Sequence, residues 1–360
     1  MNIGIIGLPS SGKTTIFNAL THGQAETGTY HAGTFSVNMG AVNVPDLRVD
    51  KLSAMYKPRK TVYAQVQFKD VAGIEGGSSK GSSLGGRLLN ELGANDALLH
   101  VVRAFTNLAV PHPNGSVNPR RDYEAMETEL ILSDMAVIEK RLERLQKERT
   151  RSEQPLELPL MQRLIAHLEA QKPLRSIDLT AEEERLLRSY SLLSLKPMVI
   201  VLNVNDDADA NANVNEAEQQ LAALLGREIL LQLRGKLEME LAQMDTADAA
   251  MFLEEFGLSE PGLDRVIRAG YDLLGVQSFF TVGEDEVRAW TVRRGAPAVE
   301  AAGVIHSDLA KGFIRAEVVS YQDLITTGSI PEARRVGKFR LEGRDYIVKD
   351  GDILHVRFNL

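Results

Sequence analysis

The sequence has 360 residues, no cysteine, a formal net charge of −8 and a hydrophobic content of 44%. This length predicts two or three domains with a sizeable core. The lack of cysteine excludes disulfides, thiolate zinc sites and a cysteine nucleophile. The net acidity argues against broad non-specific binding to nucleic acid. No basic leader precedes an apolar segment, and no apolar run reaches the roughly 18 residues of a membrane span, so we expect a cytoplasmic protein.

Short apolar runs alternate with helical segments through much of the chain. Strands separated by helices predict an α/β fold with a parallel, doubly wound sheet, in which ligands bind at the carboxyl ends of the strands. The expected strands are residues 2–6, 62–68, 97–102, 197–202 and 228–231, and the expected helices are residues 13–20 and 216–225.

A phosphate-binding pattern lies between the first expected strand and the first expected helix. Gly7–Thr14, GLPSSGKT, matches G-x-x-x-x-G-K-[ST], and its glycines let main-chain N–H groups face phosphate at a helix N-terminus. Lys13 would contact the β- and γ-phosphates, Thr14 would bind Mg²⁺ and Thr15 would reach the α-phosphate. The alternative is a glycine-rich turn with an exposed lysine. The nucleotide contacts that we expect here are Gly7, Pro9, Ser10, Ser11, Gly12, Lys13, Thr14 and Thr15.

A second phosphate-associated pattern, DVAG, begins at Asp70 at the end of an expected strand. The carboxylate would face the metal, and Gly73 would offer its N–H to the γ-phosphate. The Gly- and Ser-rich residues 73–86 predict a switch loop that the γ-phosphate orders, with a plain linker as the alternative. Ile74 stands where many G proteins carry a glutamine that orients water, and an aliphatic side chain cannot do that.

The residues Asn203–Asp206, NVND, follow the expected strand at 197–202. In G proteins the corresponding N-K-x-D sequence accepts hydrogen bonds from guanine through its carboxylate, while the lysine packs over the base. Asp206 keeps the acceptor, but Val204 replaces the lysine. An ordinary Asn/Asp loop is the alternative, and the sequence leaves ATP and GTP both open.

Collinear segments over nearly the whole chain resemble the YchF/Obg-like ATPase family, a branch of the Obg-related P-loop NTPases with a C-terminal TGS domain. The resemblance implies a Mg²⁺-dependent nucleotide hydrolase that has a hydrophobic residue in place of the catalytic glutamine. Family members favour ATP or use ATP and GTP together. The segments that carry the likeness are GLPSSGKTTIFNAL at 7–20, TFSVNMGAVNVPDLR at 34–48, DVAGIEGGSSKGSSLGGRLL at 70–89, HVVRAF at 100–105, KPMVIVLNVND at 196–206, GLDRVIRAGYDLLG at 262–275 and residues 287–318.

The same resemblance implies further site residues. Thr34 matches the switch threonine that meets Mg²⁺ and the γ-phosphate. His112 matches a loop histidine that is thought to help catalysis, with a solvated loop histidine as the alternative. Lys236 matches part of the family's fifth nucleotide motif, whereas Arg234 replaces the small polar residue that normally opens it.

The resemblance and the patterning together predict three domains. Residues 1–120 and 194–276 would form the P-loop NTPase domain, 121–193 a helical coiled-coil insertion, and 277–360 a ubiquitin-like β-grasp (TGS) domain of strands and turns. In that last domain we expect a KDGD turn that joins two strands and a core role for Trp290. The a/d spacing of Ile131, Met135, Ile138, Leu142 and Leu145 predicts one helix, and Met161, Leu164 and Leu168 predict a second after Pro155 and Pro159.

The basic tip of that hairpin, residues 139–151, has six cations and three glutamates. It suits ribosomal RNA phosphates, or it is a solvated face with i,i+4 ion pairs.

We therefore expect a monomeric, slow nucleotide-dependent switch that hydrolyses ATP or GTP with Mg²⁺ and binds the ribosome, without DNA sequence recognition or membrane contact. The alternatives are a GTP-specific GTPase, and an RNA- or ribosome-binding protein with a structural nucleotide. A P-loop kinase is disfavoured because no arginine-rich lid is evident. The expected catalytic residues are Lys13, Thr34, Gly73 and His112, the metal ligands are Thr14, Thr34 and Asp70, and the base contacts are Asn203, Val204, Asp206 and Lys236.

Overall fold

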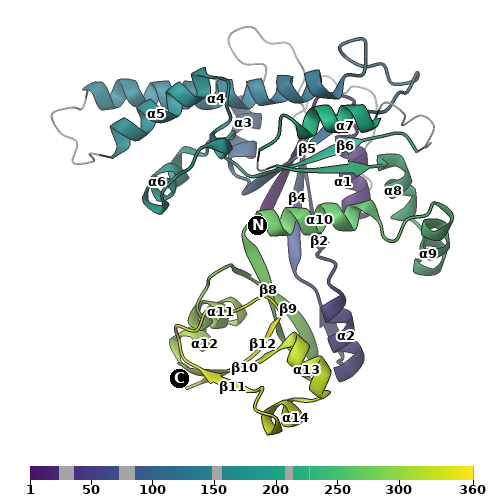
Figure 1. Cartoon of the computed structure of the whole chain (residues 1–360), viewed down its shortest axis with the longest axis vertical. Helices are drawn as coiled ribbons and strands as arrows, with labels where there is room; N and C mark the ends of the chain where they lie inside the picture. Colours follow the sequence, from purple (N-terminus) through teal and green to yellow (C-terminus); the bar gives the residue numbers. More distant parts are fainter. Residues whose placement is uncertain (24–35, 73–85, 148–155, 207–213, 227, 360) are drawn as a thin grey trace. The chain divides into compact units, whose positions relative to one another are not determined.

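A computed structural model describes residues 1–23, 36–72, 86–147, 156–206, 214–226 and 228–359 (Figure 1). The chain forms two compact units, the first from Met1–Ala41 and Gln67–Gly270 and the second from Val42–Val66 and Tyr271–Leu360. Within the described ranges, no helix has an apolar stretch long enough to cross a bilayer.

The first unit is built on a six-stranded sheet with the order β2-β4-β1-β5-β6-β7. The ladders from β4 through β1, β5 and β6 to β7 are parallel, which confirms the predicted doubly wound α/β sheet. Every residue of β5 and β6 is buried, as expected for strands covered on both faces. The strands are β1 (Asn2–Ile6), β2 (Ser36–Asn43), β4 (Gln65–Ala72), β5 (Ala97–Arg103), β6 (Met198–Asn203) and β7 (Ile229–Leu233).

Helices cover this sheet and enclose its apolar core. One core cluster joins Ile6, Leu98 and Ile200 of the strands to Leu92 and Leu221 of the flanking helices. The helices are α1 (Lys13–Thr21), α3 (Gly86–Gly93), α7 (Val214–Ala222), α8 (Gly235–Leu241), α9 (Thr246–Glu255) and α10 (Gly262–Leu273).

A helical hairpin extends the first unit, and Figure 1 shows its two helices, α4 and α5, side by side. The helix α4 spans Pro119–Lys147 and α5 spans Glu157–Glu169. The predicted a/d residues pack together, and the Arg141 guanidinium contacts both carboxylate oxygens of Glu157 at 2.7 Å. The second helix begins before Pro159, because a proline in the first turn costs no helical hydrogen bond. The elements η1 (Leu174–Ser176), α6 (Ala181–Leu187) and η2 (Arg188–Tyr190) follow.

The second unit has its own six-stranded sheet, with the order β11-β10-β12-β8-β9-β3. Its core joins Phe279, Val318 and Leu354 of the strands to the small residues Ala298 and Ala302 of α11. The strands are β3 (Lys60–Val62), β8 (Val276–Thr281), β9 (Glu286–Arg293), β10 (Phe313–Ser320), β11 (Arg340–Glu342) and β12 (Asp352–Phe358), and the helices are α2 (Leu47–Tyr56), α11 (Ala298–Ile305), α12 (Ser307–Lys311), α13 (Tyr321–Thr327) and α14 (Ile330–Arg335).

Residues 42–66 differ from the expectation, which places residues 1–120 in one domain and a single strand at 62–68. Residues Lys60–Val62 pair in parallel with β9, and α2 packs against both β3 and β9. This segment therefore belongs to the second unit. The expected strand is therefore two strands in two sheets. The apolar pattern locates strands, but it does not specify which distant sheet each strand joins.

The expected turn at KDGD is present, since the Asp352 N–H donates to the Lys349 carbonyl oxygen, but the expectation that it joins two strands is wrong. Residues 343–351 form turns with one isolated bridge, Pro297 to Ile347, and only β12 follows them. The carboxylates hold the loop instead, because Asp350 accepts from the Ser278 N–H and Asp352 accepts from the Lys349 N–H. Four helices also occupy a region where we expected mainly strands and turns.

Trp290 packs against the core of the second unit, as predicted. Its indole N–H donates to the Thr281 hydroxyl at 2.9 Å, so the polar edge of the ring has a partner. The Arg288 guanidinium lies 4.0 Å from the ring centroid, as residues two apart on a strand share a face.

Candidate functional site

The loop between β1 and α1 has the backbone shape that phosphate binding requires. Gly7 and Gly12 have φ angles of 149° and 95°, and Ser10 lies in the left-handed region at 61°. A Cβ atom at Gly7 would lie 2.4 Å from the Val101 carbonyl oxygen, and one at Gly12 would lie 2.3 Å from Asn203 Nδ2. Neither position has room for a side chain, so the loop packs tightly against the ends of β5 and β6.

Lys13 begins α1 and folds back over this loop. Its ammonium donates to the carbonyl oxygens of Gly7 and Leu8, both at 2.9 Å. Burial lowers the pKa of Lys13 to about 8, and the nearby charge of Asp70 opposes that shift. The cation is thus held by two neutral carbonyl groups that triphosphate oxygens can replace.

Thr14 and Asp70 meet at the carboxyl ends of β1 and β4. The Thr14 hydroxyl donates to Asp70 Oδ2 at 2.8 Å, while Asp70 Oδ1 is buried with no hydrogen-bond partner among the described residues. Burial raises the pKa of Asp70, and the Thr14 hydrogen bond and the Lys13 charge oppose the rise.

This oxygen pair fits a magnesium ion. Adjacent ligands of octahedral Mg²⁺ lie about 3 Å apart, which is close to the 2.8 Å between the Thr14 and Asp70 oxygens. No group of three or more His, Asp or Glu side chains in the described part of the chain could hold a metal by itself. The donor set therefore fits an ion that is shared with phosphate oxygens and water.

Asn203 joins the phosphate loop to the segment after β7. Its side-chain amide donates to the Ser11 carbonyl oxygen at 3.0 Å and accepts from the Gly235 N–H at 3.1 Å. These bonds engage both the nitrogen and the oxygen of the buried amide, so Asn203 ties the phosphate loop to the residues after β7, and its contact with the base stays a prediction. The hydroxyl of Ser11 is buried with no partner among the described residues.

Asp206 is the acceptor that remains open in this region. Its Oδ1 is buried without a hydrogen-bond partner among the described residues, and Lys236 Nζ lies 3.9 Å from Oδ2. The Lys236 side chain is 72% exposed and can move toward a ligand. Val204 is buried in the core of the sheet, so its side chain does not occupy the place that a base-stacking lysine would take.

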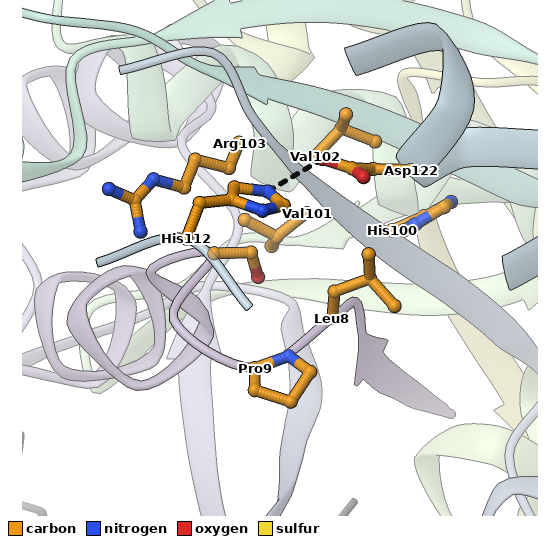
Figure 2. A pocket seen from close by; sticks show the side chains of 9 residues that line it. Leu8, Pro9, His100, Val101, Val102, Arg103, His112 and Asp122 are labelled. Carbon is orange, nitrogen blue, oxygen red and sulfur yellow. Dashed lines mark hydrogen bonds and ion pairs between the residues drawn. The ribbon is translucent and has the colours of Figure 1, made fainter. Parts of the chain in front are cut away.

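His112 is not a solvated loop histidine, since its side chain is only 4% exposed. Its Nε2 lies 2.8 Å from Asp122 Oδ2, and Nδ1 accepts a hydrogen bond from the Asn114 N–H at 3.1 Å. An accepting Nδ1 places the proton on Nε2, which donates to Asp122. Figure 2 marks this contact beside Leu8 and Pro9 of the phosphate loop. With both ring nitrogens occupied, His112 must leave Asp122 before it can act on a nucleotide.

Two predicted residues cannot be placed. Thr34 and Gly73 lie outside the described residues, and their roles stay predictions. The expectation missed one buried residue, Arg103, which contacts the phosphate loop directly. A single arginine at the end of a strand, as in HVVRAF, carries no pattern that shows what it contacts.

Comparisons with known proteins match both parts of the chain. A family model described as a 50S ribosome-binding GTPase matches residues 2–141, and a model of the C-terminal domain of YchF GTPases, described as a protein of unknown function, matches residues 276–359.

Similar proteins cover the whole chain. The ribosome-binding ATPase YchF of Bacillus subtilis is 43% identical over all of both chains, and that of Escherichia coli O157:H7 is 42% identical over 99% of each. The solved structure of the Schizosaccharomyces pombe YchF GTPase is 32% identical, covers 99% of this chain and 97% of that one, and superposes with a TM-score of 0.87. With this identity along its full length, and with a phosphate loop, an Asp70–Thr14 pair and an Asn203 bridge in place, the chain belongs to the YchF family.

Proposed function

We propose that this protein is a Mg²⁺-dependent nucleoside triphosphatase that hydrolyses ATP or GTP slowly. The observation that carries the proposal is the convergence of Lys13, Thr14 and Asp70 at one edge of the sheet, where the cation and the hydroxyl lie beside a carboxylate with one oxygen unpartnered among the described residues. The similar proteins are named ATPases and a GTPase, which supports the same chemistry and leaves the base open.

Each residue has a defined task in this proposal. The loop at residues 7–12 offers main-chain N–H groups to the phosphates, and Lys13 exchanges its two carbonyl partners for phosphate oxygens. Thr14 and Asp70 hold Mg²⁺, which when bound neutralises charge on the β- and γ-phosphates. Ile74 cannot orient water and His112 is engaged with Asp122, so we expect slow basal turnover.

The proposal includes a partner. The bacterial relatives are named ribosome-binding ATPases, and we extend that partner to this chain, acting as a monomer in the cytoplasm. The γ-phosphate would order Thr34 and the segment 73–86, and hydrolysis would release them. The α4–α5 hairpin and the second unit would then report the nucleotide state to the ribosome.

Phosphate release tests the proposal. We would measure Mg²⁺-dependent release from ATP and from GTP, together with the two dissociation constants, with and without ribosomes. We expect slow release that requires Mg²⁺, and Lys13→Ala serves as the inactive control. Triphosphate binding that is unchanged in Lys13→Ala would refute the assignment of the phosphate site.

A second candidate is a ribosome- or RNA-binding protein for which the nucleotide is a structural ligand. The engagement of both His112 ring nitrogens favours it, because this predicted catalytic side chain is then bonded to Asp122 and Asn114 rather than free to act on a nucleotide. This candidate predicts tight triphosphate binding with negligible phosphate release even when ribosomes are present.

A further inference from the structure

Arg103, at the end of β5, is a buried cation held by main-chain groups. Its residue exposure is 3%. The guanidinium donates three hydrogen bonds to the described residues, and all of them end on carbonyl oxygens: Ser10 at 3.1 Å, Phe105 at 3.1 Å and Val110 at 2.8 Å. Its carbon lies 4.3 Å from the centroid of the Phe105 ring. Burying a guanidinium without a bonded carboxylate is costly, so its position calls for a reason beyond packing.

The first carbonyl belongs to the phosphate loop at its most strained point. Ser10 has a φ of 61°, which a residue with a side chain adopts rarely and at a cost. The Ser10 carbonyl precedes the N–H of Ser11 in the same peptide plane. That N–H donates to the Leu8 carbonyl oxygen at 3.3 Å, so holding the Ser10 carbonyl fixes the turn from Leu8 to Ser11 within the loop that offers main-chain N–H groups to phosphate. Arg103 therefore orients the phosphate loop through its bond to the Ser10 carbonyl oxygen.

The other two carbonyls belong to the segment that leads to His112. Phe105 and Val110 lie in the irregular residues 104–118, between β5 and α4. His112 follows Val110 by two residues and is bonded to Asp122 in the first turns of α4. Figure 2 draws Arg103, His112 and Asp122 around the same pocket as Leu8 and Pro9. One guanidinium thus ties the phosphate loop to this segment, and His112 ties the segment to the long helix.

We propose that Arg103 is a positioning residue that couples the phosphate loop to residues 104–118, so that a change at Ser10 on triphosphate binding alters the segment that holds His112. A guanidinium suits this task because its donors point in several fixed directions, whereas a lysine ammonium is a compact group on a flexible stem. The proposal rests on the proposed function only for its nucleotide-dependent part.

The chain provides a matched control at Arg121. This arginine also contacts the segment, since it donates to the Ser116 carbonyl oxygen, and it contacts Asp122 at 2.8 Å. Neither contact reaches the phosphate loop. Arg121→Lys therefore perturbs the same segment as Arg103→Lys, without the link to Ser10.

The test is amide hydrogen exchange on the full chain, first without nucleotide. We expect Arg103→Lys to speed exchange about tenfold in both residues 8–12 and residues 105–112, and Arg121→Lys to leave residues 8–12 unchanged. Faster exchange in only one of the two segments, or in neither, would overturn the coupling. Because the lysine variant keeps a buried cation with fewer partners, the neutral Arg103→Gln repeats the test if that variant does not fold.

The nucleotide arm uses Mg²⁺ and a non-hydrolysable triphosphate analogue. In the unaltered chain we expect the analogue to slow exchange at both 8–12 and 105–118, and in Arg103→Lys only at 8–12, with affinity about tenfold weaker. Equal protection of 105–118 in both proteins would overturn the proposal. If the unaltered chain binds no triphosphate, the proposed function fails, and the nucleotide-free comparison still decides the role of Arg103.

Discussion

Thr14 Oγ1 donates a 2.8 Å hydrogen bond to Asp70 Oδ2, across 56 positions of the chain. The bond joins the start of α1 to the end of β4, and it leaves the second carboxylate oxygen of Asp70 unpartnered among the described residues. A hydroxyl and a carboxylate held at this spacing are suited to share one small divalent ion. The adjacency makes these two residues the first to alter.

Asp70→Asn is expected to separate catalysis from stability. Phosphate release with Mg²⁺ should fall by about 100-fold or more, because the amide is a poor magnesium ligand. Burial raises the pKa of Asp70 above 3.8, so the ionised carboxylate lowers the folding stability at neutral pH. This loss of stability develops as the pH rises from 3.8 through the raised pKa. Urea unfolding at pH 7 should therefore show Asp70→Asn at least as stable as the unaltered chain. A variant that retains full Mg²⁺-dependent release would exclude Asp70 as a ligand.

Lys13→Ala should remove tight triphosphate binding, while Lys51→Ala, which alters an exposed lysine of α2, should not. Titration of a fluorescent triphosphate analogue measures both variants.

The pH dependence of binding gives a second measure of Lys13. Its folded pKa of about 8 lies below its usual 10.5, so the nucleotide-free protein loses this charge above about pH 8. Triphosphate affinity should decline above that pH, and folding stability should rise from pH 8 to 10.5 because the unfolded chain binds the extra proton. An affinity in the unaltered chain that stays constant to pH 10 would contradict this assignment.

Asp206→Asn should change the choice of base. A carboxylate accepts from the two donors of guanine, whereas adenine offers one donor and an acceptor to the same edge. We expect GTP affinity to fall by about tenfold and ATP affinity to change much less. Competition binding with both nucleotides measures the ratio. Equal losses for ATP and GTP would mean that Asp206 shapes the loop without contacting the base.

His112→Ala and Asp122→Asn test whether the buried histidine takes part in turnover. If His112 acts after it leaves Asp122, then His112→Ala lowers turnover with unchanged affinity, and Asp122→Asn raises turnover because the histidine is released more easily. Single-turnover phosphate release with saturating nucleotide measures both. Normal turnover in His112→Ala would leave this histidine with a packing role alone.

Asp134→Ala should destabilise the first unit strongly. Its carboxylate accepts three hydrogen bonds at 2.7 Å, from the Leu193 N–H and from the N–H and hydroxyl of Ser194. Removing it leaves buried donors unpaired, at a cost of about 2 to 4 kcal/mol in the free energy of unfolding. Urea unfolding compares it with Glu169→Ala, which alters an exposed residue of α5. A loss below about 1 kcal/mol would mean that water replaces the carboxylate.

The sequence predicts those parts of the fold and the site that depend on local spacing. The residues 2–20 form a strand, a loop and a helix because their glycines, lysine and apolar residues are close neighbours. The hairpin follows from the spacing of Ile131 to Leu145, since helical periodicity fixes which side chains share a face. The pairing of Thr14 with Asp70 follows in turn because parallel strands bring their carboxyl ends to one edge.

The features that escape prediction depend on tertiary partners. Nothing local in HVVRAF specifies that Arg103 meets the Ser10 carbonyl, and nothing in the segment around His112 specifies that Asp122 buries it. The membership of Val42–Val66 is a similar case, because the edge that β3 joins is formed by residues near 286.

Residues 42–66 belong to the second unit although the residues on both sides of them belong to the first, and this has a consequence for biosynthesis. The strand β3 leaves the ribosome early, but its partner β9 is complete only when residue 293 has been made. At ordinary elongation rates, roughly 10 to 45 seconds pass between the synthesis of β3 and the synthesis of β9, the strand with which β3 pairs. During that interval a strand edge and the apolar face of α2 are exposed to other chains. A truncated chain that ends before the second unit never covers them, so it should aggregate even if its nucleotide site folds.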